Sequence, residues 1–144
     1  MRVVVDSSLA IKWFIFESDT PLANELLIAW IRDDIERVMP NWAMLEVSNA
    51  LLQTLYEDPI SLDAVLLNLA EIQRFVRFID ATLEVLMRAL TLARDFNSRS
   101  IYNFHFLALA EHLGCELWTA DHKFWRTTHD TFSFVKWIGN VGTR

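Results

Sequence analysis

Short apolar runs alternate with stretches long enough for helices along nearly the whole chain. Apolar or β-branched runs typical of strands occupy residues 2–5, 37–39, 75–79, 116–119 and 132–137. Helical stretches between strands predict a parallel sheet, because the crossover between two parallel strands needs about a helix of chain. We therefore expect an α/β fold, a three-layer α/β/α domain with a central parallel sheet of four to five strands and helices on both faces.

Several expected helices have clear start or stop signals. Pro21 suits the first turn of a helix that opens at residue 20 and extends to about residue 32. The pair Asp58-Pro59 ends a long helix over 42–57. Gly114 suits the left-handed position after a helix over 100–113. Further helices are expected over residues 8–14, 61–73 and 81–95.

The length and composition fit one soluble domain. Of the 144 residues, 53% are hydrophobic and 22% are charged, which excludes a disordered chain. We expect residues 1–138 to form the domain and residues 139–144 to be a flexible tail. There is one cysteine, Cys115, no apolar run long enough for a membrane span, and no signal-peptide core before Asp6. We expect a cytoplasmic protein with no membrane partner.

The glycine count and the net charge exclude other function classes. Three glycines cannot form the Gly-rich loops of dinucleotide enzymes or P-loop NTPases. The four histidines lack the short helical spacing of metal ligands. A net charge of −6 argues against non-specific nucleic-acid binding through a basic surface. It leaves room for an enzyme that acts on nucleic acid through cations bound to carboxylates.

Two aspartates lie at the ends of predicted strands. Asp6 directly follows the first strand, and Asp121 comes after Ala120 at the end of the fourth. Ligands of an open parallel sheet bind beyond the carboxyl ends of the strands, where the strand order reverses. If the chain crosses from the first strand to the fourth as its neighbour, both carboxylates face one crevice. The alternative is that each aspartate is a turn former or a helix N-cap.

Glu46 and Asn103 lie on predicted helices. Periodicity places Glu46 on a polar face, as an ordinary solvated glutamate near a helix start. Asn103 lies one turn into the helix over 100–113, in an apolar stripe. Burying its amide without a partner costs about 1–3 kcal/mol. Asn103 is therefore either bonded to neighbouring backbone or part of a site at the sheet edge.

Four segments resemble the motifs of PIN-domain proteins, in particular the VapC-like toxins of bacterial type II toxin–antitoxin pairs. The order and the element types agree, and the resemblance extends from residue 1 to about 138. The four segments are residues 4–14 (VVDSSLAIKWF), 45–51 (LEVSNAL), 103–111 (NFHFLALAE) and 117–121 (LWTAD).

The resemblance implies a metal-dependent endoribonuclease that cuts a structured RNA such as tRNA or rRNA. Carried over to this chain, Asp6, Glu46, Asn103 and Asp121 would bind Mg²⁺ or Mn²⁺ and form the catalytic site. Oxygen ligands suit such hard cations, which activate water for in-line displacement at phosphorus. Ser8, at a helix start beside Asp6, would hold a ligand water or a phosphate oxygen. The implied partners are a cognate antitoxin and a second copy in a homodimer.

Position 103 departs from the family pattern, which has aspartate there. The amide oxygen can still ligate, but one negative charge is missing and asparagine cannot act as a base. This predicts either a nuclease that tolerates the change or a degenerate PIN domain that binds RNA or protein without cutting. A third reading is a phosphoacceptor domain of the receiver type, with Asp80 after the third strand as acceptor.

Overall fold

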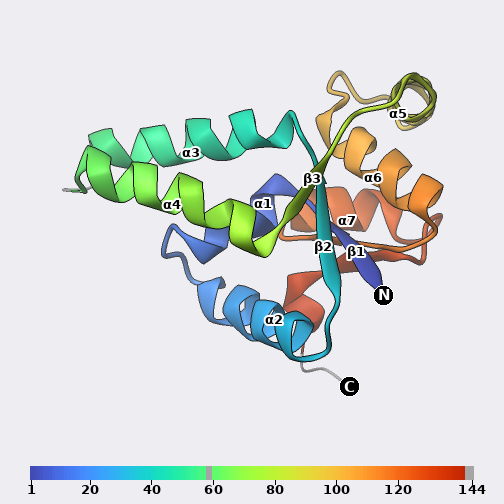
Figure 1. The fold of residues 1–144 in the computed structure, drawn as a ribbon. Helices are drawn as coiled ribbons and strands as arrows, with labels where there is room; N and C mark the ends of the chain where they lie inside the picture. The colour runs from blue at the N-terminus through green and yellow to red at the C-terminus, as the bar shows by residue number, and fades with distance from the viewer. Residues whose placement is uncertain (58–59, 142–144) are drawn as a thin grey trace.

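The computed structural model describes residues 1–57 and 60–141. Five parallel strands form one sheet in the order β3-β2-β1-β4-β5, which confirms the predicted α/β class (Figure 1). The first strand is central, and the chain crosses from one side of it to the other between β3 and β4. The strands are β1 (Arg2–Val5), β2 (Glu36–Pro40), β3 (Arg77–Ile79), β4 (Glu116–Thr119) and β5 (Val135–Trp137).

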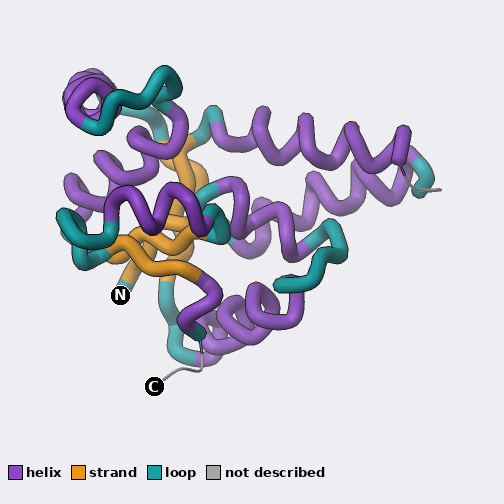
Figure 2. The backbone as a smooth tube through the Cα atoms, turned by 180° about the vertical axis from the view of Figure 1, so that it is seen from behind, coloured by secondary structure: helices purple, strands orange, loops and turns teal. Residues whose placement is uncertain are grey.

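Helices cover both faces of the sheet. In Figure 1, α2 lies at the lower left, and α5 and α6 lie at the upper right. Helices α3 and α4 run out and back as a pair that projects from the sheet, as Figure 2 also shows. The helices are α1 (Ser7–Ala10), η1 (Ile11–Trp13), α2 (Thr20–Arg32), α3 (Ala43–Glu57), α4 (Leu62–Phe75), α5 (Leu83–Asp95), α6 (Tyr102–Leu113), α7 (His122–Thr128) and η2 (Ile138–Asn140).

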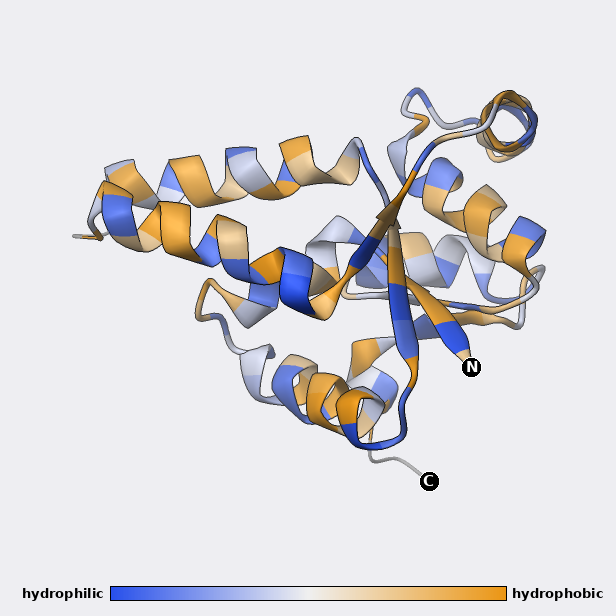
Figure 3. Ribbon diagram, viewed as in Figure 1, coloured by the Kyte–Doolittle hydropathy of each residue, from blue (hydrophilic) through white to orange (hydrophobic). Residues whose placement is uncertain are grey.

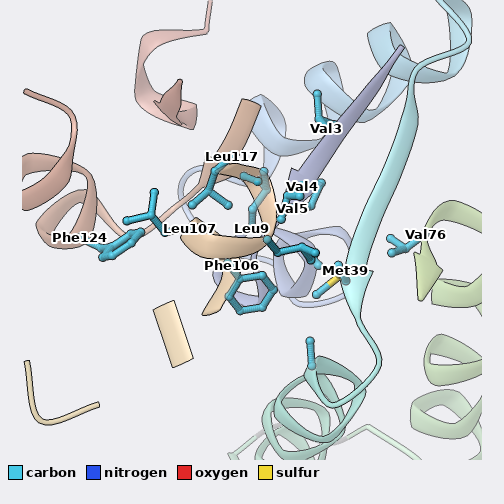
Figure 4. Close-up of a cluster of buried hydrophobic side chains, with 14 of the residues drawn as sticks. Val3, Val4, Val5, Leu9, Met39, Val76, Phe106, Leu107, Leu117 and Phe124 are labelled. Atoms are coloured by element: carbon cyan, nitrogen blue, oxygen red, sulfur yellow. The ribbon is translucent and has the colours of Figure 1, made fainter. Parts of the chain in front are cut away.

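The core lies between the sheet and the helices. Residues 3–5 of β1 are fully buried, which explains a continuous β-branched run in a strand covered on both faces. Figure 3 shows the change from a hydrophilic start to this apolar run. Figure 4 shows Leu107 of α6 beside Leu117 of β4, with Phe106 and Met39 close by. On the other face, Trp30 of α2 contacts Trp118 edge-on, with ring centroids 5.8 Å apart.

Several helices and strands begin or end at other residues than the sequence predicts. The helix over 8–14 is one turn of α-helix followed by the 3-10 turn η1, and strand β3 begins only at Arg77 because Phe75 still ends α4. The last strand is three residues rather than six. Helix α7 was not predicted at all. The predicted stop at Asp58-Pro59 lies outside the described residues.

Two expectations concern the chain end and membranes. Gly139 and Asn140 belong to η2, which contacts α2, while residues 142–144 of the expected tail lie outside the described part. Within residues 1–57 and 60–141, no helix has both the length and the apolar character needed to cross a membrane.

Candidate functional site

Asp6 lies directly after the central strand and is the most deeply buried acid of the site, with 2% of its surface exposed. Its backbone N–H donates to Trp118 O of β4 at 3.1 Å, which extends the pairing of β1 and β4. Its Oδ1 accepts from Leu9 N at 3.0 Å and from Ser8 Oγ at 2.7 Å. Asp6 is therefore the N-cap of α1 and also faces the end of β4.

Thr119 joins Asp6 to the second aspartate. Its hydroxyl donates to Asp6 Oδ2 and accepts from Asp121 N at 2.9 Å. Burial raises the pKa of Asp6 to about 6, although the bonds from Thr119, Ser8 and Leu9 lower it, and the charge of Asp121 raises it further. The carboxyl ends of β1 and β4 thus lie side by side where the strand order reverses, and Thr119 links the Asp6 carboxylate to the backbone of Asp121.

The two carboxylate oxygens of Asp121 accept hydrogen bonds from different residues. Oδ1 accepts from Phe124 N at 2.9 Å and caps α7, while Oδ2 accepts from Asn103 Nδ2 at 3.2 Å. The partner of Asn103 is thus a site carboxylate and not the backbone of a neighbouring strand. In both aspartates one carboxylate oxygen caps a helix, while the other accepts a side-chain hydrogen bond, from Thr119 for Asp6 and from Asn103 for Asp121.

Glu46 reaches the site through Ser7. Ser7 Oγ donates to Glu46 Oε2 at 2.7 Å, across 39 residues of chain. Ser7 is buried and directly follows Asp6, so the first turn of α3 is tied to the end of β1. Glu46 is therefore half-buried and bonded, which differs from the solvated glutamate that periodicity alone predicts.

Sequence reasoning missed Ser7 and Thr119 as members of this network. It singled out Ser8, whose hydroxyl donates to Asp6 and accepts from Ala120 N at 3.1 Å. Ser8 thus joins the ends of β1 and β4. The available signal for Thr119 was a polar residue in a buried strand two positions before Asp121.

The donors of this cluster are carboxylate, amide and hydroxyl oxygens, which suit Mg²⁺ or Mn²⁺ better than softer metals. Within the described part of the chain, no three His, Cys, Asp or Glu side chains lie close enough to hold one ion between them. Mg²⁺ is usually held by one or two carboxylates and keeps several waters. A pair of carboxylates, such as those of Asp6 and Asp121, is chemically sufficient for this mode.

The hypothesis of a receiver-type phosphoacceptor domain is wrong. Asp80 follows β3, which is an edge strand, and β2 lies between β3 and β1. Its carboxylate accepts from Asn41 Nδ2 at 2.6 Å, on the exposed surface. A phosphoacceptor would have to share a crevice with Asp6, and this topology puts Asp121 there instead.

Comparisons with known proteins agree with the fold described above. The fold is similar to the crystal structure of PAE2754 from Pyrobaculum aerophilum, with a TM-score of 0.70 and 16% identity over 97% of this chain and 94% of that one. A comparison with curated proteins found no match. The family model of the PIN domain, a group whose members are generally nucleases and typically use divalent metals, matches residues 3–129. The chain therefore belongs to the PIN domain family.

Proposed function

We propose that this protein is a metal-dependent endoribonuclease whose site consists of Asp6, Glu46, Asn103 and Asp121. The observation that carries the proposal is the hydrogen-bonded network at the carboxyl edge of the sheet. In this network Ser7, which directly follows Asp6 in the chain, donates to Glu46, Thr119 bonds the Asp6 carboxylate and the backbone of Asp121, and Asn103 donates to Asp121. These contacts among four distant segments support the proposal, because phosphoryl transfer needs groups held in a fixed geometry.

In this proposal Asp6 and Asp121 hold the cation, Mg²⁺ or Mn²⁺. When bound, the cation supplies a polarised phosphoryl oxygen and an activated water. Thr119 and Ser8 fix the orientation of the Asp6 carboxylate, while the Asn103 amide fixes that of Asp121. Glu46, oriented by Ser7, orients water for attack on the phosphate.

A second candidate function is binding without cleavage. It is favoured by the contact between Asn103 Nδ2 and Asp121 Oδ2, in which the amide donor occupies an oxygen that would otherwise face a cation. A PIN domain of this kind would recognise RNA or a protein partner and leave the phosphodiester intact.

Cleavage of total RNA in Mn²⁺ separates the two functions, with this protein compared with its Asn103→Asp variant. Each protein is also tested with Asp6→Asn added, which controls for contaminating nuclease. The nuclease proposal expects cleavage by this chain that Asp6→Asn abolishes. Cleavage only after Asn103→Asp supports the binding function for this chain. If neither protein cuts RNA or binds Mn²⁺, the nuclease proposal is wrong.

We also propose, by resemblance, a toxin role with a cognate antitoxin and a homodimer. Support comes from apolar side chains that are exposed on two surfaces. Figure 3 shows the apolar residues along α3 and α4 in orange. Such surfaces mark contact sites when they are contiguous. One surface, on α3 and α4, carries Leu45, Tyr56, Leu66 and Leu67, and the other, along α5, carries Leu83, Met87 and Leu90. Light scattering of the Met87→Glu variant tests the homodimer, which this change is expected to dissociate.

A further inference from the structure

A cavity of about 350 Å³ opens beside the proposed site, between the loop at residues 96–100 and helix α7. Asn103 and Asp121 form part of its wall, so the cavity is continuous with the acidic cluster. Its volume is within the range of small-molecule sites, near the lower end. It is the right size for one nucleobase with part of its sugar.

The inner wall of the cavity is aromatic. Phe96, Phe104 and Phe124 line it, and the Phe104 ring lies 5.6 Å from that of Phe96 and 5.5 Å from that of Phe124, measured between centroids. Phe104 and Phe124 are buried in the core, so they form a rigid floor, and the half-buried Phe96 is the most exposed of the three rings. Rigid aromatic rings favour a flat, polarisable ligand, since every nucleobase has a π face.

The rim of the cavity is polar. Ser98, Ser100 and Thr127 bring hydroxyls to it, and Lys123 brings a charge. The Lys123 side chain is exposed and has no ion-pair partner within residues 1–57 and 60–141. In a chain of net charge −6, an unpaired ammonium two residues after Asp121 is placed to contact an anion at the site.

We propose that this cavity accepts the base of an unpaired RNA nucleotide next to the phosphate at the acidic cluster, with Lys123 on a backbone phosphate. The inference rests on the proposed ribonuclease function for its choice of RNA. A paired base cannot leave its stack without an unpairing cost, so the cavity selects single-stranded or looped RNA over duplex. The rim hydroxyls and Asn97 supply donors and acceptors to the edge of the base.

Thr127→Trp fills the cavity from an exposed position of α7. Thr91→Trp is the control on α5, away from the cavity, because half-buried Thr91 also bonds the carbonyl four residues earlier in its helix. Binding of a labelled single-stranded oligoribonucleotide is measured by fluorescence anisotropy in EDTA, so that no strand is cut. We expect Thr127→Trp to weaken binding about 10- to 100-fold and Thr91→Trp to leave it unchanged.

Lys123→Ala is expected to weaken binding about 3- to 10-fold and to lower the salt dependence by about one phosphate contact. Arg126→Ala, an exposed residue of α7 that does not line the cavity, is the control and has a smaller effect. A duplex of the same sequence is expected to bind weakly to every variant. Ser100→Trp, from the opposite rim, repeats the test if Thr127→Trp lowers the melting temperature.

Parallel cleavage assays in Mn²⁺ keep the two proposals apart. If the parent protein cuts RNA but Thr127→Trp and Ser100→Trp bind and cut as the parent does, the cavity proposal is overturned and the nuclease proposal stands. If the parent does not cut but Thr127→Trp loses binding, the cavity proposal stands and the nuclease fails. If the parent neither binds nor cuts RNA, or if duplex binds as tightly as the single strand, the cavity proposal is overturned.

Discussion

Asn103 Nδ2 donates to Asp121 Oδ2 at 3.2 Å, although 18 residues separate the two in the chain. Oδ1 of Asp121 caps α7, and the bond from Asn103 gives Oδ2 a hydrogen-bond donor. An aspartate at position 103 would place a second negative charge against that oxygen. The asparagine therefore stabilises the cluster when no cation is bound, whereas an aspartate would need a cation between the two carboxylates.

Asn103→Asp is expected to destabilise the metal-free protein and to strengthen its affinity for Mn²⁺. The lost hydrogen bond of the amide and the added repulsion cost about 1–3 kcal/mol. This is less than the roughly 4 kcal/mol between two charges at ~4 Å and an effective dielectric of ~20, because the site is partly exposed. Urea unfolding in EDTA and in Mn²⁺ measures both effects. Asn97→Asp on the exposed loop is the control, and equal changes in the two variants would contradict the role of Asn103.

Much of this arrangement was predictable from the sequence. Asp6 and Asp121 follow buried strands, and a parallel sheet brings the ends of neighbouring strands together. Their use as N-caps did not compete with the site, because a carboxylate has two oxygens. The amide of Asn103 stood out because a polar group in an apolar stripe needs a partner.

Other features depended on tertiary contacts that no local pattern reports. Periodicity placed Glu46 in solvent, and only the bond from Ser7, 39 residues away, places it at the site. Thr119 bonds Asp6 only because β4 pairs with β1, whereas its contact with Asp121 N is local. Helix α7 is seven residues long, which is too short for a clear helical pattern of apolar residues. Its N-cap Asp121 could equally have been a turn residue.

The raised pKa of Asp6 predicts how stability depends on pH. The native pKa of about 6 exceeds the ordinary value of 3.8, so between these values the native state binds more protons than the unfolded state. Asp6 therefore contributes stability that is fully present below about pH 4 and is lost as pH rises through 6. The loss amounts to about 3 kcal/mol at most, from a shift of about two units.

Urea unfolding from pH 4 to pH 8 in EDTA measures this dependence, with Asp6→Asn as the comparison. The variant stays neutral, so its stability is expected to exceed that of the parent at pH 8 and to approach it at pH 4. Protonation of Asp6 also competes with a cation, so Mn²⁺ affinity is expected to fall below about pH 6. If the free energy of unfolding depends on pH in the same way in both proteins, the pKa of Asp6 is not raised in the native state.

Thr119→Val is expected to raise the pKa of Asp6 still further. The hydroxyl of Thr119 lowers the pKa of Asp6 more than any other contact does, and valine has nearly the same shape without it. The variant also leaves Asp121 N without its acceptor, at a cost of about 1–3 kcal/mol.

The pKa change can be measured by carbon NMR titration of the Asp6 carboxyl. Thr128→Val is the control, since Thr128 is equally buried but bonds only a carbonyl of its own helix. Both variants lose stability, and only Thr119→Val is expected to move the titration of Asp6. An unchanged titration in Thr119→Val would show that the bond between the two side chains is not made in solution.

Glu46→Gln separates the site role of Glu46 from that of an ordinary surface residue. Glutamine keeps an oxygen that accepts from Ser7 Oγ, so the free energy of unfolding in EDTA is expected to change by less than about 0.5 kcal/mol. The lost charge is expected to weaken Mn²⁺ binding about 10- to 100-fold, the range found for residues that support a metal site. Isothermal titration calorimetry with Mn²⁺ measures it. Glu57→Gln, at the exposed end of the same helix, is the matched control. Equal Mn²⁺ affinities in the two variants would show that Glu46 is an ordinary surface glutamate with no role in metal binding.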